Sequence, residues 1–341
     1  MRIVYILRCS LFVAAVTLST SWFFPGNSRA IDLESCLRQA LVTADDSVTI
    51  GELRAQCRQD IDFPDDSAAT GAPDQGPVVH RLEQEREDAF KPFSIMSHRP
   101  NFLLPVVYNS QKYNAEYHRQ TREKYQFDRF EAQFQISIKS PLVLALFNNR
   151  MDVYAGYTNH SFWQVYNHDI SSPFRETNHE PELWVQFQPN WEIFGFRNTF
   201  NSLGINHQSN GQSGALSRSW NRFYGNIIFE RGHFVMKLTP WVRMSESEST
   251  DDNPDIIDYL GHGELGATYK WGEHTISLMV RNHVESNFSK GALQASWSFP
   301  LGAWPYLRGY VQYFNGYGES LIDYNQYVNR LGVGLSLSDW L

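Results

Sequence analysis

The chain has 341 residues, of which 15 % are aromatic, and a formal net charge of −8 at pH 7. This length suits one large domain with an appendage, and the acidic balance without a basic stripe argues against a nucleic-acid partner. Abundant aromatic residues are typical of a membrane β-barrel, whose wall carries aromatic girdles at both lipid interfaces.

Residues 1–30 have the pattern of a secretory signal peptide. Arg2 and Arg8 supply the positive start, residues 11–18 form an apolar core, and residues 28–30 (Ser-Arg-Ala) form a small-x-small cleavage site. The alternative is a membrane-anchoring helix, but the apolar core is too short to cross a bilayer. We therefore expect the mature chain to begin near Ile31 and to be exported.

Residues 31–77 are predicted to form an accessory segment, with a helical hairpin followed by an acidic linker rich in Asp, Pro, Ala and Gly. Once the signal is removed, Cys36 and Cys57 are the remaining cysteines, and in an exported protein we expect them to form a disulfide. Free buried thiols are the alternative, and no His neighbours at ligand spacing support a zinc site. Residues 78–100 are predicted to be a periplasmic lead-in, with a charged helix at 80–90.

From residue 101 onward, apolar and polar residues alternate with a period of two, which predicts strands. A soluble β-sandwich alternates in the same way. The signal peptide, segments of about ten residues, the aromatic content and the lack of a mature apolar run of about 20 residues favour an outer-membrane barrel. The expected strands are 101–109, 127–148, 151–165, 180–189, 194–209, 220–231, 233–244, 258–271, 273–284, 290–300, 304–315 and 327–340.

The predicted fold is therefore all-β: a twelve-stranded antiparallel transmembrane β-barrel over residues 101–341, with a small N-terminal periplasmic helical extension. Charged residues of one parity are expected to fill the interior with a hydrogen-bonded network, since small barrels have packed interiors. These residues are Arg129, Glu131, Lys139, Arg222, Glu230, Glu264, Lys270 and Arg308.

Three polar residues occupy positions on the otherwise apolar face of two neighbouring predicted strands. In an extended strand, His207 and Ser209 lie on the same face as the apolar residues Leu203 and Ile205. Asn221 shares the apolar face of the next strand in the same way. They supply a base, a nucleophile and an amide that fixes the tautomer of the base. Gly211 is the candidate oxyanion donor through its backbone N–H, although it also turns the strand into its loop. Ordinary polar residues at a barrel rim are the alternative.

The same residues carry a family resemblance. Residues 207–222, together with the blocks 171–178, 251–255 and 316–324, closely resemble motifs of the bacterial outer-membrane phospholipase A family, and the likeness covers about residues 92–341. The resemblance implies hydrolysis of acyl esters of outer-membrane phospholipids, of the phospholipase A1/A2 and lysophospholipase type. It also implies an enzyme that is dormant as a monomer and active as a calcium-bound homodimer.

The calcium ligands follow from the resemblance alone, because the loop from Gln212 to Ser219 contains no carboxylate. They are the Gln212 carbonyl and Ser217 hydroxyl of one subunit and the Ser171 carbonyl of the partner subunit, neutral oxygens that calcium accepts. A water polarised by the ion would be the second oxyanion donor. The resemblance also places Asp252 in a second calcium site, but Gly214 stands here where the family can have the acidic partner of Asp252. Asp251 and Asp252 are otherwise solvated loop acids.

Asn159 is the candidate interface residue, because it shares the parity of apolar neighbours on the third strand and needs a polar partner. A symmetric copy across a two-fold axis would satisfy it, and water at headgroup level is the alternative. The rival function for the whole chain is a non-enzymatic outer-membrane porin or structural barrel, in which the polar trio is accidental. A porin has no reason to place His207 and Asn221 on the apolar parity.

Overall fold

The computed structural model describes residues 76–341, apart from 92, 114–125, 248, 283–288, 303 and 340. The predicted signal peptide, the hairpin with Cys36 and Cys57 and nearly all of the acidic linker lie outside the described residues. No helix among the described residues is long and apolar enough to cross a membrane.

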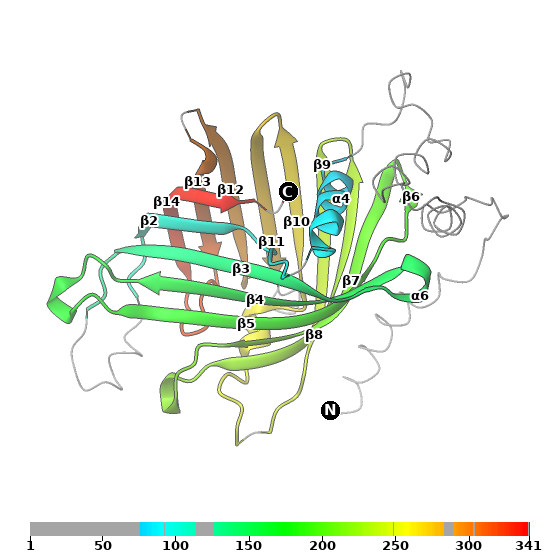
Figure 1. The fold of residues 1–341 in the computed structure, drawn as a ribbon. Coiled ribbons are helices and arrows are strands. Elements are labelled where there is room, and N and C mark those ends of the chain that lie inside the picture. The colour runs from blue at the N-terminus through cyan, green and yellow to red at the C-terminus, as the bar shows by residue number, and fades with distance from the viewer. Residues whose placement is uncertain are drawn as a thin grey trace, which may run out of the picture. The chain divides into compact units, whose positions relative to one another are not determined.

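Twelve long antiparallel strands of the described residues close into a barrel, as predicted (Figure 1). The closure comes from pairing of the first long strand with the last, so the wall has no open edge. Two short strands are also present: β1 (Met96–Ser97) pairs with the middle of β3, and β6 (Trp191–Ile193) pairs with the start of β7. The long strands are β2 (Asn101–Asn109), β3 (Phe130–Ala145), β4 (Met151–Trp163), β5 (Phe174–Phe187), β7 (Phe196–Ser209), β8 (Ser219–Arg231), β9 (Phe234–Arg243), β10 (Gly263–Trp271), β11 (His274–Asn282), β12 (Gly291–Leu301), β13 (Trp304–Gly316) and β14 (Val328–Ser338).

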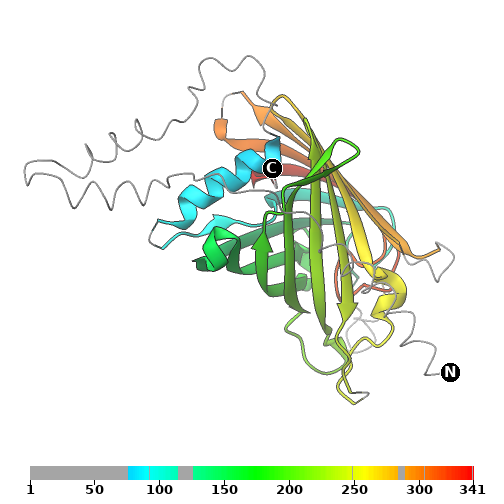
Figure 2. The same ribbon diagram turned by 90° about the vertical axis from the view of Figure 1, so that its right-hand side faces the viewer.

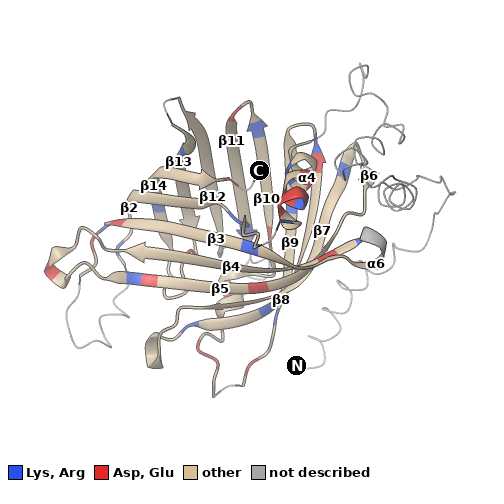
Figure 3. Ribbon diagram, viewed as in Figure 1, with Lys and Arg blue, Asp and Glu red and all other residues tan. Residues whose placement is uncertain are grey.

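The two faces of the barrel differ in polarity, and β7 illustrates this. Ser202 and Asn206 point inward and are 2 % and 3 % exposed, whereas Leu203 and Ile205 point outward and are 65 % and 45 % exposed. A water-soluble sandwich would bury the apolar face, whereas a membrane barrel presents it to hydrocarbon. Most of each strand is uncharged (Figure 3). We call the apolar outer face the wall and the inner space the lumen.

The lumen holds the predicted charged network. The Glu131 carboxylate accepts hydrogen bonds from Arg175 at 3.0 Å and from Arg330 at 2.6 Å, and Glu180 pairs with Arg222 at 2.7 Å. Each of these buried charges thus has an opposite partner, which offsets the cost of removing it from water. A cavity of about 410 Å³ remains, lined in part by Arg222, Glu264 and Lys237.

One predicted member of this network is misplaced. Arg129 precedes β3 at the rim, is exposed, and donates a hydrogen bond to the Tyr108 hydroxyl at 3.3 Å. The strand begins only at Phe130, so the inward parity of the strand does not extend to Arg129. The remaining predicted residues lie inside, including Lys270, which donates to the Leu341 carbonyl, and Arg308, which pairs with Asp339.

The two ends of the barrel differ in the length of their connections. One end has tight turns at 232–233 and 272–273 and the short helix α6 (Leu146–Asn149). The other end has long connections that contain η1 (His168–Ile170), η2 (Gly214–Leu216) and α7 (Ile256–Leu260). In outer-membrane barrels the short turns face the periplasm and the long loops face outward.

Helix α4 (Pro77–Ala89) lies at the short-turn end of the barrel (Figure 2). Val78 packs with Ile228 and Val235, and its backbone N–H donates to Glu230 at 3.0 Å. Glu85 pairs with Lys139 of β3 at 2.7 Å. The helix starts three residues earlier than expected, because proline is favoured in a first helical turn.

The predicted strand 127–148 is too long, because β3 ends at Ala145 and residues 146–148 belong to α6. Two strand starts are misplaced further. β10 begins at Gly263 rather than at residue 258, because residues 256–260 form α7. Ile256 and Leu260 pack into an apolar cluster, and Gly261 ends the helix with a φ of 68°. Strand β5 begins at Phe174, six residues earlier than expected, because its ladder with β4 continues to that residue.

Candidate active site at the outer end of β7 and β8

The antiparallel pairing of β7 and β8 brings two of the predicted site residues together. His207 lies directly opposite Asn221, and its Nδ1 is 2.8 Å from the Asn221 Oδ1. Their sequence neighbours Gln208 and Arg222 line the luminal cavity, whereas His207 and Asn221 do not. Because successive residues of a strand point to opposite faces, the imidazole and the amide lie on the wall.

This hydrogen bond determines the state of the neutral imidazole. A carbonyl oxygen only accepts, so Nδ1 carries the proton and Nε2 is left with a free lone pair. Ser209 is two residues further along β7 and shares the face of His207. Within the described part of the chain, its hydroxyl makes no hydrogen bond to His207. Nucleophile and base are often loosely placed until substrate binds.

Asn210 fixes the loop that follows the nucleophile candidate. Its side-chain oxygen accepts from the backbone N–H of Gln212 at 3.2 Å and of Arg218 at 3.0 Å, and its amide donates to the Leu216 carbonyl at 2.9 Å. These bonds close the loop onto itself, as asparagine side chains do in tight turns. Gly211 sits in this turn with a φ of 65°, a conformation that favours glycine.

A row of polar residues crosses the wall at the level of Ser209. The strand registers pair Asn159 of β4 with His179 of β5, His179 with Ser209, and Ser209 with Ser219 of β8. The His179 Nδ1 is 2.6 Å from the Tyr157 hydroxyl. Ser161 and Thr177 lie opposite each other on the same face, with their hydroxyl oxygens 3.2 Å apart. Polar residues therefore gather at this end of the wall.

Asn159 lies on the wall as the sequence indicates, and its carboxamide has a partner within its own strand. The Ser161 hydroxyl donates to the Asn159 Oδ1 at 2.9 Å. A partner copy is therefore not needed to satisfy that oxygen. The interface role of Asn159 stays a prediction.

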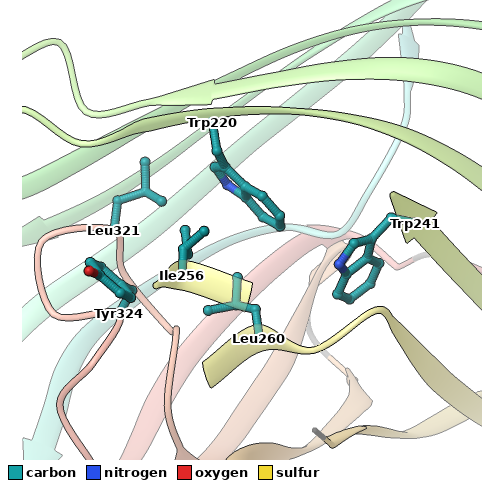
Figure 4. Packing of buried hydrophobic residues seen from close by; sticks show 6 residues of the cluster. All are labelled: Trp220, Trp241, Ile256, Leu260, Leu321 and Tyr324. Atoms are coloured by element: carbon teal, nitrogen blue, oxygen red, sulfur yellow. The ribbon is translucent and has the colours of Figure 1, made fainter. Parts of the chain in front are cut away.

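The four motif blocks, which are far apart in sequence, converge below the site. Trp220, next to Asn221, is fully buried in a cluster of side chains from β8, β9, α7 and the 317–327 connection (Figure 4). The 171–178 block joins them, because Asn178 accepts a hydrogen bond from the Leu321 N–H at 3.1 Å. The cluster consists of Trp220, Trp241, Ile256, Leu260, Leu321 and Tyr324.

The predicted metal ligands are only partly assembled. The Ser217 hydroxyl donates to Asp252 Oδ2 at 2.5 Å, so these two oxygens lie together, and Gln212 is exposed in the same loop. Asp251 is not a free loop acid, because it pairs with Arg243 at 2.6 Å. Ser171 lies in a different connection, with a φ of 62°. Among the described residues no group of three or more His, Cys, Asp or Glu side chains could hold a metal.

Sequence reasoning missed two contacts of the site. Asn253, which is fully buried, accepts a hydrogen bond from the Ser219 N–H at 3.0 Å and so ties the 244–262 connection to β8. In the same connection, Glu246 accepts a hydrogen bond from the Asn221 amide at 3.3 Å. No periodicity extends into that connection, so only a three-dimensional structure identifies these contacts.

Known proteins share both the sequence and the fold. The family model for phospholipase A1 matches residues 78–337. A phospholipase A1 of Klebsiella pneumoniae is 34 % identical over 269 residues, which cover 78 % of this chain and 88 % of that protein. The crystal structure of the Salmonella typhi outer membrane phospholipase dimer with bound calcium is 34 % identical and has a TM-score of 0.68, covering 74 % of this chain and 95 % of that one.

A second solved structure, from Escherichia coli, is also similar. It is an outer membrane phospholipase A in which an asparagine is replaced by alanine to give an active-site mutant. Its TM-score is 0.67 at 33 % identity, over 74 % of this chain and 95 % of that chain. The closed barrel, the family match and these relatives together show that the chain belongs to the phospholipase A1 family, as an integral β-barrel enzyme of the bacterial outer membrane.

Proposed function

We propose that this protein hydrolyses acyl ester bonds of outer-membrane phospholipids, of the phospholipase A1/A2 and lysophospholipase type, with Ser209 as nucleophile. The observation that carries the proposal is the 2.8 Å hydrogen bond between His207 and Asn221 on the wall, with Ser209 on the same face. Acyl chains in the membrane have direct access to that face, whereas they do not reach the lumen.

The chemistry follows from the groups present. The free Nε2 of His207 takes the proton of the Ser209 hydroxyl as its oxygen attacks the ester carbonyl. His207 then passes that proton to the leaving alcohol, and a water molecule repeats the sequence to release the fatty acid. Asn221 holds the imidazole in the reactive tautomer throughout. Because an amide is neutral, it avoids placing an anion in contact with hydrocarbon.

The Gly211 N–H is the proposed donor to the oxyanion. It makes no hydrogen bond to the described residues, so it is available to the developing negative charge on the substrate oxygen. The φ of 65° is the physical reason for glycine here, because a side chain would strain this turn.

We further propose that activity requires calcium and a homodimer, as in the Salmonella typhi structure, a dimer with bound calcium. The proposed ligands are the Gln212 carbonyl, the Ser217 hydroxyl and the Ser171 carbonyl of the partner subunit. The pair formed by Ser217 and Asp252, with oxygens 2.5 Å apart, suits a hard cation that prefers oxygen. When bound, calcium would supply positive charge and a polarised water to the oxyanion. Asn159 is the proposed contact residue of the dimer.

The experiment is fatty-acid release from phospholipid in mixed micelles, with calcium and with chelator, for the purified protein and two variants. Ser209→Ala should abolish release. Ser202→Ala is the matched control, because it makes the same change on the same strand but on the luminal face. Equal rates for Ser209→Ala and the unmodified protein would overturn the proposal. Equal rates with calcium and with chelator would overturn its calcium part alone.

A further inference from the structure

The Asn221 amide makes a second contact, away from His207. Its Nδ2 donates to Glu246 Oε1 at 3.3 Å, while its Oδ1 lies 2.8 Å from His207 Nδ1. We propose that Glu246 is a positioning residue that sets the orientation of the Asn221 amide and through it the reactive tautomer of His207. This inference rests on the proposed function, in which Asn221 orients the base.

The orientation argument depends on which atoms can donate. An ionised carboxylate has only acceptor oxygens, so the NH₂ end of the Asn221 amide must face Glu246. The carbonyl end then faces His207 and accepts from Nδ1, which leaves the Nε2 lone pair for the nucleophile. With the amide flipped, its oxygen would face the carboxylate and its NH₂ would favour the tautomer with the proton on Nε2. Glu246 disfavours that unreactive arrangement.

The charge of Glu246 adds to this effect. An amide alone stabilises the imidazolium that forms during catalysis less than the carboxylate of a Ser-His-Asp triad does. A carboxylate hydrogen-bonded to the far end of the amide polarises it, so the carbonyl becomes a stronger acceptor for His207. The negative charge of Glu246 thereby stabilises the His207 imidazolium through the Asn221 amide, without contacting the imidazole itself.

The position of Glu246 makes a charge tolerable. It follows the end of β9 at Arg243, within the 244–262 connection at the outer end of the barrel, and is half-buried there. Glu246 therefore belongs to the outer loops. An anion on the wall within the hydrocarbon region would be costly. The Met244 N–H donates to the Asn221 carbonyl at 2.8 Å, which holds this segment beside β8.

The test is a double-mutant comparison of phospholipid hydrolysis at saturating calcium. Glu246→Ala should lower kcat about 10-fold, the loss expected when a hydrogen bond to a charged group is removed. KM should stay within about 2-fold, because Glu246 acts through Asn221 and not on substrate binding. Glu192→Ala is the matched control, an exposed glutamate of β6 whose removal should leave kcat unchanged.

The same substitution is then made in the Asn221→Ala background. If Glu246 acts through the amide, Glu246→Ala causes no further loss there. The inference is overturned by an unchanged kcat in the single variant, by an equal loss in both backgrounds, or by a matching loss in the control. Failure of the proposed function has a different signature, which is full activity of Ser209→Ala. The heat-modifiable electrophoretic mobility of each variant reports whether its barrel is folded.

Discussion

The lumen and the wall are built from the same strands, yet they treat polar groups differently. In the lumen, charged residues such as Glu131 and Arg175 are buried and paired, because an unpaired charge there would destabilise the barrel. On the wall, the fold requires only apolar side chains, so His207 and Asn221 are not needed for folding. Polar residues inside this barrel therefore have a structural role, whereas polar residues on its wall indicate a functional site.

The largest loss of activity is expected at the proposed general base, His207. His207→Ala should lower kcat about 10⁶-fold, as removal of the histidine does in serine proteases, while the barrel stays folded. Initial rates on phospholipid micelles measure the loss, and circular dichroism checks the fold. Gln208→Ala, one residue along but facing the lumen, is the control and should keep most activity. A His207→Ala rate within 10-fold of the unmodified protein would exclude the imidazole as the base.

A luminal change should have the opposite signature. Glu131→Gln leaves Arg175 and Arg330 without their shared carboxylate, and breaking such a buried pair costs about 3–5 kcal/mol of unfolding free energy. Denaturant unfolding in detergent measures the loss. Glu192→Gln, an exposed change, should stay within about 0.5 kcal/mol of the unmodified protein. Equal stability of Glu131→Gln would mean that the luminal network is not structural.

The calcium proposal predicts a smaller effect at the rim. Asp252→Asn removes the charge beside the Ser217 hydroxyl, so the calcium concentration for half-maximal activity should rise about 10-fold. A calcium titration of hydrolysis gives that value. Asp128→Asn is the control, because it makes the same change at an exposed residue just before β3, outside the connections that hold Ser217 and Asp252. An unaltered calcium requirement would show that Asp252 is not part of the metal site.

The smallest effect concerns the attachment of α4 to the lumen. Burial raises the pKa of Glu85, but the nearby Lys139 ammonium and Arg81 guanidinium outweigh this and hold it below its ordinary value. A carboxyl with a lowered pKa stabilises the folded state above its ordinary pKa of about 4.3, and this contribution disappears as the pH falls through the lowered value. The protection factors of the α4 amides, which correct hydrogen exchange for its intrinsic pH dependence, should therefore fall in acid below about pH 4.

Glu85→Gln separates this cause from general acid effects. The variant lacks the titrating group, so its α4 protection factors should already be lower at neutral pH and should change less on acidification. If both proteins show the same acid response, the ion pair with Lys139 does not fasten the helix.

The sequence predicts the strands and the wall face because both depend on a period of two. His207 and Asn221 were identifiable as exceptions to that period. The loop contacts of Asn210, Asn253 and Glu246 were not, because they join connections that have no periodicity. The start of β10 was misplaced for a related reason: Ile256 and Leu260 suit a strand as well as the short helix that packs on Trp220.

Several predictions concern residues outside the described part of the chain. They are the signal peptide of residues 1–30, the hairpin with its disulfide between Cys36 and Cys57, and the acidic linker. Mass spectrometry of the exported protein, with and without reduction, would give its first residue and the state of both cysteines. A mature start near Ile31 and a 2 Da change on reduction, one hydrogen added to each of two thiols, are expected.

The central claim is that Ser209, on the lipid-facing wall, is the nucleophile. Its most direct test is incubation of the calcium-loaded protein with a sulfonyl fluoride that carries a long alkyl chain, followed by peptide mass spectrometry. We expect one adduct per chain, located on Ser209, and none in His207→Ala. An adduct on another residue, with hydrolysis lost in parallel, would contradict it.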